Sequence, residues 1–255
     1  MNKLDILFNK KQKNILSIFF TAGYPKKDHT TDIIKYLEES EADLIEIGIP
    51  FSDPIADGPI IQFSNNVSIE NGVNLKSIFN DLMILKEQSR IPKLLMGYFN
   101  TVLKYGVEQF CKDCEISGID GVIIPDLPTD EFEANYKDTF EKYGIHFIFL
   151  VSPQTSLERI QKIEQLSTSF IYAVSTNSTT GGDADFDSQK IYFKRLNENL
   201  SKPFLIGFGV KDKRSNEIAC RYANGSIVGS SFINVLSKSG DMENNIKEFI
   251  KSIKK

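Results

Sequence analysis

Short apolar runs alternate with longer amphipathic stretches along the whole chain, and this alternation restricts the fold more than any other feature. The amphipathic stretches, such as DHTTDIIKYLEESEA, carry apolar residues at helical spacing and supply the crossovers that parallel strands require. The eight apolar runs are Leu16–Gly23, Asp43–Pro50, Pro92–Phe99, Asp120–Asp126, His146–Pro153, Phe170–Thr176, Pro203–Val210 and Gly225–Ser231. Eight β/α units in 255 residues predict an α/β fold, a (β/α)8 TIM barrel that forms a single domain over residues 1–255.

The composition fits one sizeable core and excludes several classes of partner. Hydrophobic residues make up 41% of the chain, and its 30 basic and 34 acidic residues are mixed along it to a net charge of -4. This distribution offers no basic stripe to nucleic acid. The N-terminus lacks an apolar signal core, and nowhere does an apolar run reach membrane-spanning length. We therefore expect a soluble, cytoplasmic protein that binds neither nucleic acid nor membrane.

The cysteines and histidines give little support to metal or triad chemistry. Three cysteines fit a reducing compartment, and Cys111 and Cys114 form a C-x-x-C inside a helical pattern with no second pair to complete a zinc site. His29 and His146 are the only histidines, and neither is near a recognisable nucleophile elbow. We expect no metal in this chain.

The segment Ala42–Gln62 places one acid inside an apolar strand and two more in the loop that follows. Alternation along the strand puts Glu46 on the same face as Leu44, away from water. Apolar surroundings disfavour the charged form of a carboxylate and raise its pKa, so that Glu46 can carry a proton near neutrality. The loop adds Asp53 and Asp57. The alternative is a Glu46 that forms a structural ion pair across the core.

Active sites of such barrels lie at the C-terminal ends of the strands. Tyr24, Asn100 and Asp126 occupy such ends here. Two connections, from Pro50 to a helix near Leu75 and Thr176–Asp187, exceed the usual length of βα loops, which makes them candidate lids or simple flexible insertions.

The last two strand ends combine glycines with a short helix, SSFINVL. Glycines allow close backbone approach, and a helix N-terminus attracts an anion. Gly209 and Gly229 therefore predict a phosphate site at the position where barrels commonly bind phosphate, although such glycines also serve tight turns.

The motifs LIEIGIPFSDPIADGP, FFTAGYP, GYFNTVLKYG, GVIIPDLPTDE, GFGV and IVGSSFI resemble, in order and spacing, the α subunit of tryptophan synthase. The resemblance covers nearly the whole chain. It implies a lyase that cleaves indole-3-glycerol phosphate to indole and glyceraldehyde 3-phosphate in a retro-aldol reaction. This reaction belongs to tryptophan biosynthesis, and thus to aromatic amino-acid biosynthesis. It also implies an α2β2 heterotetramer in which indole passes to the β subunit for L-tryptophan synthesis. No cofactor is implied for this chain, and pyridoxal phosphate is expected in the β subunit.

The resemblance also implies roles for individual residues. Glu46 would deliver the proton to indole C3 and take the proton of the glycerol hydroxyl, and Asp57 would hold the indole N–H. The implied substrate-binding residues are Phe19, Tyr98, Leu150, Tyr172, Thr180, Gly181, Phe208, Gly209, Gly229 and Ser230. The implied β-subunit interface contains Asn100, Asp126 and Pro128. In the sixth loop, Ser178 stands where the family commonly has glycine.

Two other functions remain open at this stage. One is another phosphosugar barrel, such as an isomerase of the triose-phosphate type or an imine-forming aldolase, although no catalytic His or Lys follows a strand. The other is a catalytically weakened subunit kept to activate its β partner. The presence of both Glu46 and Asp57 argues against the second.

Overall fold

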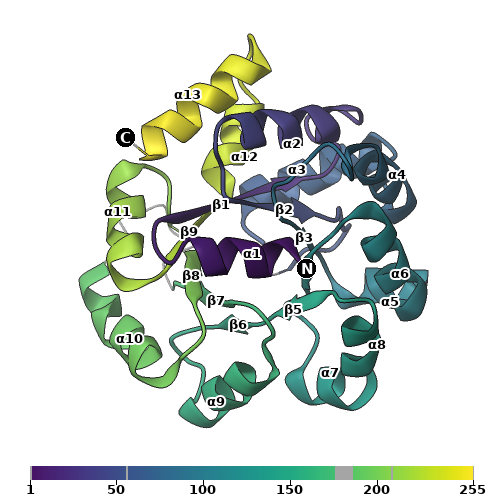
Figure 1. The fold of residues 1–255 in the computed structure, drawn as a ribbon. Helices are drawn as coiled ribbons and strands as arrows, with labels where there is room; N and C mark the ends of the chain where they lie inside the picture. Colours follow the sequence, from purple (N-terminus) through teal and green to yellow (C-terminus); the bar gives the residue numbers. More distant parts are fainter. Residues whose placement is uncertain (1, 56, 176–185, 208, 255) are drawn as a thin grey trace.

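The strands of the computed structural model, which describes residues 2–55, 57–175, 186–207 and 209–254, form one parallel barrel. The strands are β1 (Ile15–Thr21), β2 (Leu44–Gly48), β3 (Lys93–Met96), β4 (Gly121–Ile123), β5 (His146–Ile148), β6 (Leu150–Val151), β7 (Ile171–Val174), β8 (Phe204–Gly207) and β9 (Gly225–Val228). Their order is β5-β4-β3-β2-β1-β9-β8-β7-β6 (Figure 1). The predicted (β/α)8 barrel is therefore confirmed.

The fifth predicted run differs in detail, because it forms two short strands. Phe149 separates β5 from β6, and these two strands stand at the two ends of the sheet order. Each pairs with a different neighbour, β5 with β4 and β6 with β7. The carbonyl of Phe149 still accepts the N–H of Tyr172 at 2.9 Å. The chain itself therefore closes the barrel at this break.

Helices surround the barrel, and one lies across its end (Figure 1). The helices are α1 (Lys3–Lys10), α2 (His29–Glu39), α3 (Pro59–Glu70), α4 (Leu75–Leu85), α5 (Phe99–Tyr105), α6 (Val107–Ser117), α7 (Thr129–Asn135), α8 (Lys137–Lys142), α9 (Leu157–Leu166), α10 (Phe186–Asn199), α11 (Lys213–Tyr222), α12 (Ser230–Leu236) and α13 (Met242–Lys254). Among the described residues, no helix combines the length and apolar character needed to cross a membrane.

Strand alternation separates two apolar layers. The barrel interior contains Leu44 together with residues from the other strands, whereas Ile45 and Ile47 pack in the outer layer between strands and helices. The helix α1 closes one end of the barrel interior. Its fully buried Leu4 belongs to the interior cluster, and its Phe8 stacks on Phe170 with ring centroids 5.3 Å apart. The predicted face assignment of β2 is therefore confirmed.

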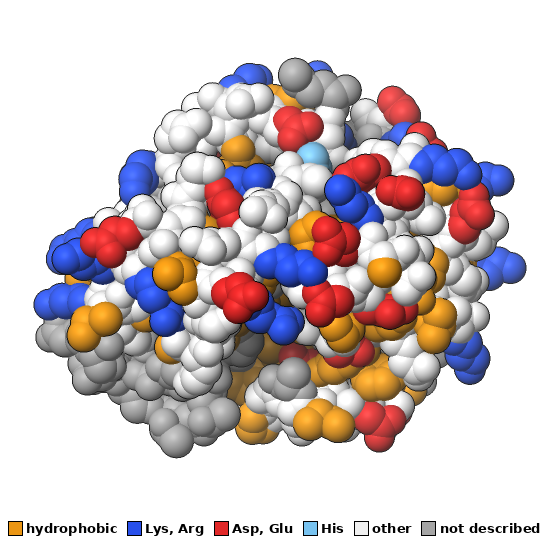
Figure 2. All heavy atoms as spheres, turned by 90° about the horizontal axis from the view of Figure 1, so that it is seen from below, with side chains coloured by type: hydrophobic (Ala, Val, Ile, Leu, Met, Phe, Trp, Pro, Cys, Tyr) orange, Lys and Arg blue, Asp and Glu red, His pale blue; other side chains and the backbone are white. Residues whose placement is uncertain are grey.

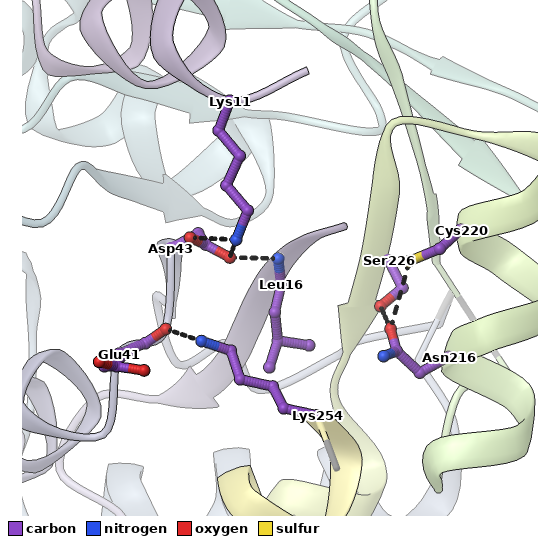
Figure 3. Close-up of polar contacts among 8 residues, drawn as sticks. All are labelled: Lys11, Leu16, Glu41, Asp43, Asn216, Cys220, Ser226 and Lys254. Atoms are coloured by element: carbon purple, nitrogen blue, oxygen red, sulfur yellow. Dashed lines mark hydrogen bonds and ion pairs between the residues drawn. The ribbon is translucent and has the colours of Figure 1, made fainter. Parts of the chain in front are cut away.

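Polar contacts fasten the chain ends to the α1 end of the barrel (Figure 3). The carboxylate of Asp43 accepts hydrogen bonds from Lys11 Nζ at 2.6 and 2.7 Å and from the Leu16 N–H at 2.8 Å. The ammonium of Lys254, at the end of α13, donates to the carbonyl of Glu41. Both ends of the chain thereby hold the start of β1 and the approach to β2.

The predicted long connection from Pro50 to a helix near Leu75 is wrong, because α3 occupies much of it. Pro59 stands at the first turn of α3, where its fixed φ favours helix formation. The buried face of α3 carries Ser64, Asn65 and Ser68. Polar residues on a buried face leave no apolar periodicity, so the usual sequence signal for a helix was absent.

Candidate active site

A pocket that is partly open to solvent lies at the barrel end opposite α1. Its lining is mostly apolar and consists of Phe19, Gly48, Ile49, Asp57, Ile61, Asn65, Met96, Gly97, Tyr98, Pro125 and Leu150. Figure 2 shows hydrophobic side chains gathered around a hollow in the lower part of the view, on the side away from α1. Such a lining suits a flat apolar ligand that carries a few polar groups.

Glycine at position 48 makes room for the floor of this pocket. A Cβ atom there would lie 2.7 Å from Cζ of Phe19, closer than real Cβ contacts. The Phe19 ring therefore lies directly over the backbone of β2, two residues beyond Glu46. The lack of a side chain at position 48 therefore leaves the space that the aromatic ring at position 19 occupies.

Glu46 is fully buried on the interior face of β2. Its Oε1 accepts a hydrogen bond from Ser17 Oγ at 2.7 Å, whereas its buried Oε2 has no hydrogen-bond partner among the described residues. Burial raises the pKa of Glu46 from 4.5 to about 7, and the hydrogen bond from Ser17 opposes this rise. A carboxyl group in this state can both donate and accept a proton near neutral pH.

Asp57 lines the pocket just before α3 begins. Its Oδ2 accepts a hydrogen bond from the Tyr98 hydroxyl at 3.2 Å, and the Tyr98 ring stacks on Phe51 with centroids 4.8 Å apart. Burial raises the pKa of Asp57 from 3.8 to about 6, and the bond from Tyr98 opposes the rise. The two acids thus lie at the same end of the barrel, but Glu46 is more deeply buried than Asp57. Asp57 has the lower pKa and is the stronger acid.

Tyr172 lies on β7, inside the barrel, and its phenol is close to both carboxylates. Its pKa is raised well above the ordinary value of 10.0, first by burial and then by the charges of Glu46 and Asp57. Gly207 on the neighbouring strand leaves space for it, because a Cβ there would lie 2.2 Å from the Tyr172 hydroxyl oxygen. Tyr172 therefore lies near both acids but is not among the residues that line the pocket.

The remaining predicted binding residues fall into two groups. Phe19, Tyr98 and Leu150 line the pocket. Gly229 precedes α12, and a Cβ built on it would lie 3.7 Å from the ring of Phe19, so Gly229 lies beside a lining residue, and Ser230 follows it as the first residue of α12. Gly209 has a positive φ of 77°, which favours glycine there. Three predicted residues, and Ser178, lie outside the described residues: Thr180, Gly181 and Phe208.

The three predicted interface residues lie close to one another at the pocket rim. Asn100, Asp126 and Pro128 are all exposed. The carboxylate of Asp126 accepts the N–H of Phe99 at 2.9 and 3.1 Å, which fixes the β4–α7 connection against the start of α5. Pro125 and Tyr98, the chain neighbours of this contact, line the pocket. A partner bound here would touch residues next to the site.

Sequence reasoning missed two polar residues of the site, Ser17 and Asn65. Ser17 stands in an apolar strand run, where a lone serine gives no functional signal. Asn65 lies on the weakly patterned helix α3, lines the pocket and is only 4% exposed. The alternation rule could have placed Ser17 inside the barrel, because it lies two residues from Phe19 on the same strand.

Lys93 bears on the imine-aldolase alternative. This lysine is fully buried, and burial lowers its pKa to about 8. It stands at the start of β3, however, and its register partner is Ile45 of the outer layer, whereas the next residue, Leu94, pairs with Glu46. Lys93 therefore faces away from the pocket, at the other end of the strand. The structure does not support a Schiff base in this pocket.

The C-x-x-C pair is also accounted for. Cys111 and Cys114 are free, buried thiols of α6, and burial raises the pKa of Cys111 to about 12 and that of Cys114 well above its ordinary value. Neither forms a thiolate at neutral pH. Within the described ranges, no cluster of three or more His, Cys, Asp or Glu side chains is arranged to hold a metal ion.

Comparison with known proteins agrees with this geometry. The family described as "Tryptophan synthase alpha chain" matches residues 7–255. This chain belongs to the tryptophan synthase alpha chain family. The family's protein from Flavobacterium psychrophilum is 50% identical over 96% of both chains, and that from Christiangramia forsetii is 46% identical over 100% of this chain and 99% of its own.

Solved structures of the same family superimpose closely. The tryptophan synthase subunit alpha of Legionella pneumophila has a TM-score of 0.90 at 30% identity, covering 100% of this chain and 97% of its own. A chain from the study of mutual activation of the tryptophan synthase a2b2 complex of Pyrococcus furiosus has a TM-score of 0.88 at 31% identity, covering 95% of this chain and 98% of its own. The barrel described above is therefore the fold of this family.

Proposed function

We propose that Glu46 and Asp57 perform in this chain the lyase reaction of its family, the cleavage of indole-3-glycerol phosphate to indole and glyceraldehyde 3-phosphate. One observation carries the proposal. Asp57 lines an apolar pocket and Glu46 is buried beside it, and burial raises the pKa of Asp57 to about 6 and that of Glu46 to about 7. Different surroundings that separate two such groups let one site supply both an acid and a carboxylate.

The reaction then balances with these two groups alone. Protonated Glu46 gives its proton to C3 of the indole ring, and ionised Asp57 accepts a hydrogen bond from the ring N–H, where positive charge develops. The bond between indole C3 and the first glycerol carbon breaks, and its electron pair restores the ring. The hydroxyl on that carbon loses its proton to the Glu46 carboxylate and becomes the aldehyde, which returns Glu46 to its starting state.

The pocket provides suitable surroundings for each part of the substrate. Phe19, Leu150 and the other apolar lining residues would enclose the indole ring, which favours burial of an aromatic surface. Gly229 and Ser230 would bind the phosphate through the first N–H groups of α12, together with Gly209 and, by the family resemblance, Gly181, whereas the resemblance assigns Phe208 to the indole lining. Tyr172, in the barrel interior, would help to hold the two acids in position.

The partner follows from the family. We propose that indole passes to a β subunit, which binds at Asn100, Asp126 and Pro128 in an α2β2 heterotetramer. The exposure of these residues beside the pocket rim supports this placement. The family resemblance assigns pyridoxal phosphate to the β subunit. In this chain, proton transfer by the two carboxylates would account for the cleavage without a cofactor.

The test is the turnover of two isosteric variants. Glu46→Gln and Asp57→Asn should each lower turnover of indole-3-glycerol phosphate at least ~100-fold, since positioned proton transfer typically contributes that much. Asp53→Asn is the matched control, because Asp53 is an exposed acid of the same loop whose carboxylate accepts a hydrogen bond from the neighbouring Ser52 hydroxyl at 2.6 Å.

Assays with and without the β subunit separate the alternatives. Turnover by the wild-type chain that disappears in Glu46→Gln supports the proposal. Near-normal turnover in Glu46→Gln removes this residue from the mechanism. A wild-type chain that is inactive in both assays but still stimulates the β subunit would instead be the weakened subunit.

A further inference from the structure

Ser17 is the one side chain among the described residues that hydrogen-bonds Glu46. It lies on β1, is fully buried, and has the interior residue Leu44 as its register partner on β2. The neighbouring strand β9 places Ile227 beside it. A serine hydroxyl buried among apolar side chains needs a hydrogen-bond partner, and Oε1 of Glu46 is that partner at 2.7 Å.

The two oxygens of Glu46 are therefore not equivalent. Oε1 is occupied by Ser17, whereas Oε2 is buried and without a partner among the described residues. A buried carboxylate oxygen left in this state is costly, and a substrate hydroxyl or a proton on that oxygen removes the cost. Because Ser17 donates its only hydroxyl proton, its bond to Oε1 also favours placing the acidic proton on Oε2.

We propose that Ser17 is a positioning residue for the cleavage reaction: its hydroxyl fixes Oε1 of Glu46, so that the proton moves to and from the substrate through Oε2. This inference rests on the proposed function of Glu46. Ser17 also favours the carboxylate form by hydrogen-bonding to it. Its removal should therefore leave Glu46 protonated to a higher pH.

The test is the pH profile of turnover in Ser17→Ala. In the wild type, activity should require ionised Asp57 and protonated Glu46, which gives an acid limb from Asp57 and an alkaline limb from Glu46. Ser17→Ala should lower turnover about tenfold near neutral pH, as the side chain of Glu46 loses its orientation, and should shift only the alkaline limb to higher pH. Ser17→Thr, which keeps the hydroxyl, should restore both values.

The control is Ser226→Ala, which removes a fully buried serine of β9 that bonds to Asn216 instead (Figure 3). Ser226→Ala should leave the acid and alkaline limbs of the pH profile at their wild-type positions. A substitution that only destabilises the fold should also leave both limbs unchanged. An alkaline limb of Ser17→Ala at the wild-type pH would overturn the inference. The proposed function fails separately, through retained turnover in Glu46→Gln, whereas an inactive Glu46→Gln with an unmoved limb in Ser17→Ala refutes only the role of Ser17.

Discussion

Replacing Glu46 by glutamine should stabilise the protein at alkaline pH while abolishing its chemistry. The pKa of Glu46 is raised from 4.5 to about 7 in the folded state. Each unit corresponds to about 1.4 kcal/mol, so holding the ionised form in the folded protein costs about 3 kcal/mol. Between these two pKa values the folded state binds more protons than the unfolded state, and the free energy of unfolding therefore falls as pH rises.

The cost is nearly absent below pH 4.5 and complete above pH 7. Glutamine does not titrate, so the stability of Glu46→Gln relative to the wild type should increase by about 2 to 3 kcal/mol between pH 5 and pH 8. Denaturant unfolding of both proteins at the two pH values measures this change, and any constant effect of the substitution cancels. Asp53→Asn, at an exposed site, should change by less than about 0.5 kcal/mol. A Glu46→Gln difference that is equal at both pH values would refute the claim that the folded state holds Glu46 in apolar surroundings.

Two further substitutions separate the pocket from the rest of the barrel. Gly48→Ala should weaken substrate binding about tenfold or more with the fold retained, because its Cβ would lie 2.7 Å from Phe19 Cζ and displace the ring; an unchanged KM in steady-state assays would contradict this. Leu4→Ala should lower the free energy of unfolding by about 2 to 5 kcal/mol, since Leu4 is fully buried under the barrel, yet leave kcat unchanged; a loss of kcat in the folded variant would show that α1 affects the chemistry.

The barrel could be predicted from the sequence because its strands are buried on both faces and its helices on one. Continuous apolar runs and helical spacing are the direct result of that burial. The same rule placed Glu46 inside, since its neighbours Ile45 and Ile47 had to face the helices. The break at Phe149 was not predictable, because the run continues through it without a turn residue.

The polar parts of the site were harder to predict because they lack periodicity. Ser17 is a lone small polar residue in an apolar strand run, and only the position of Glu46 on the neighbouring strand gives its hydroxyl a role. The pocket-lining Asn65 belongs to a helix whose buried face is polar. The roles of Thr180, Gly181 and Phe208 stay predictions from the family resemblance.

The helix α3 links the two acids, although its sequence hid it. Glu46 is fixed by β2 and by Ser17 of β1, whereas Asp57 stands just before α3, so their separation depends on how α3 docks on the barrel. The docking is polar: Ser64 Oγ lies 2.7 Å from Thr21 Oγ1, and Ser68 donates to the carbonyl of Ala22, both at the end of β1. Directional bonds of this kind fix a helix more specifically than apolar contact alone. The buried serines that erased the helical pattern are therefore the groups that hold Asp57 in register with Glu46.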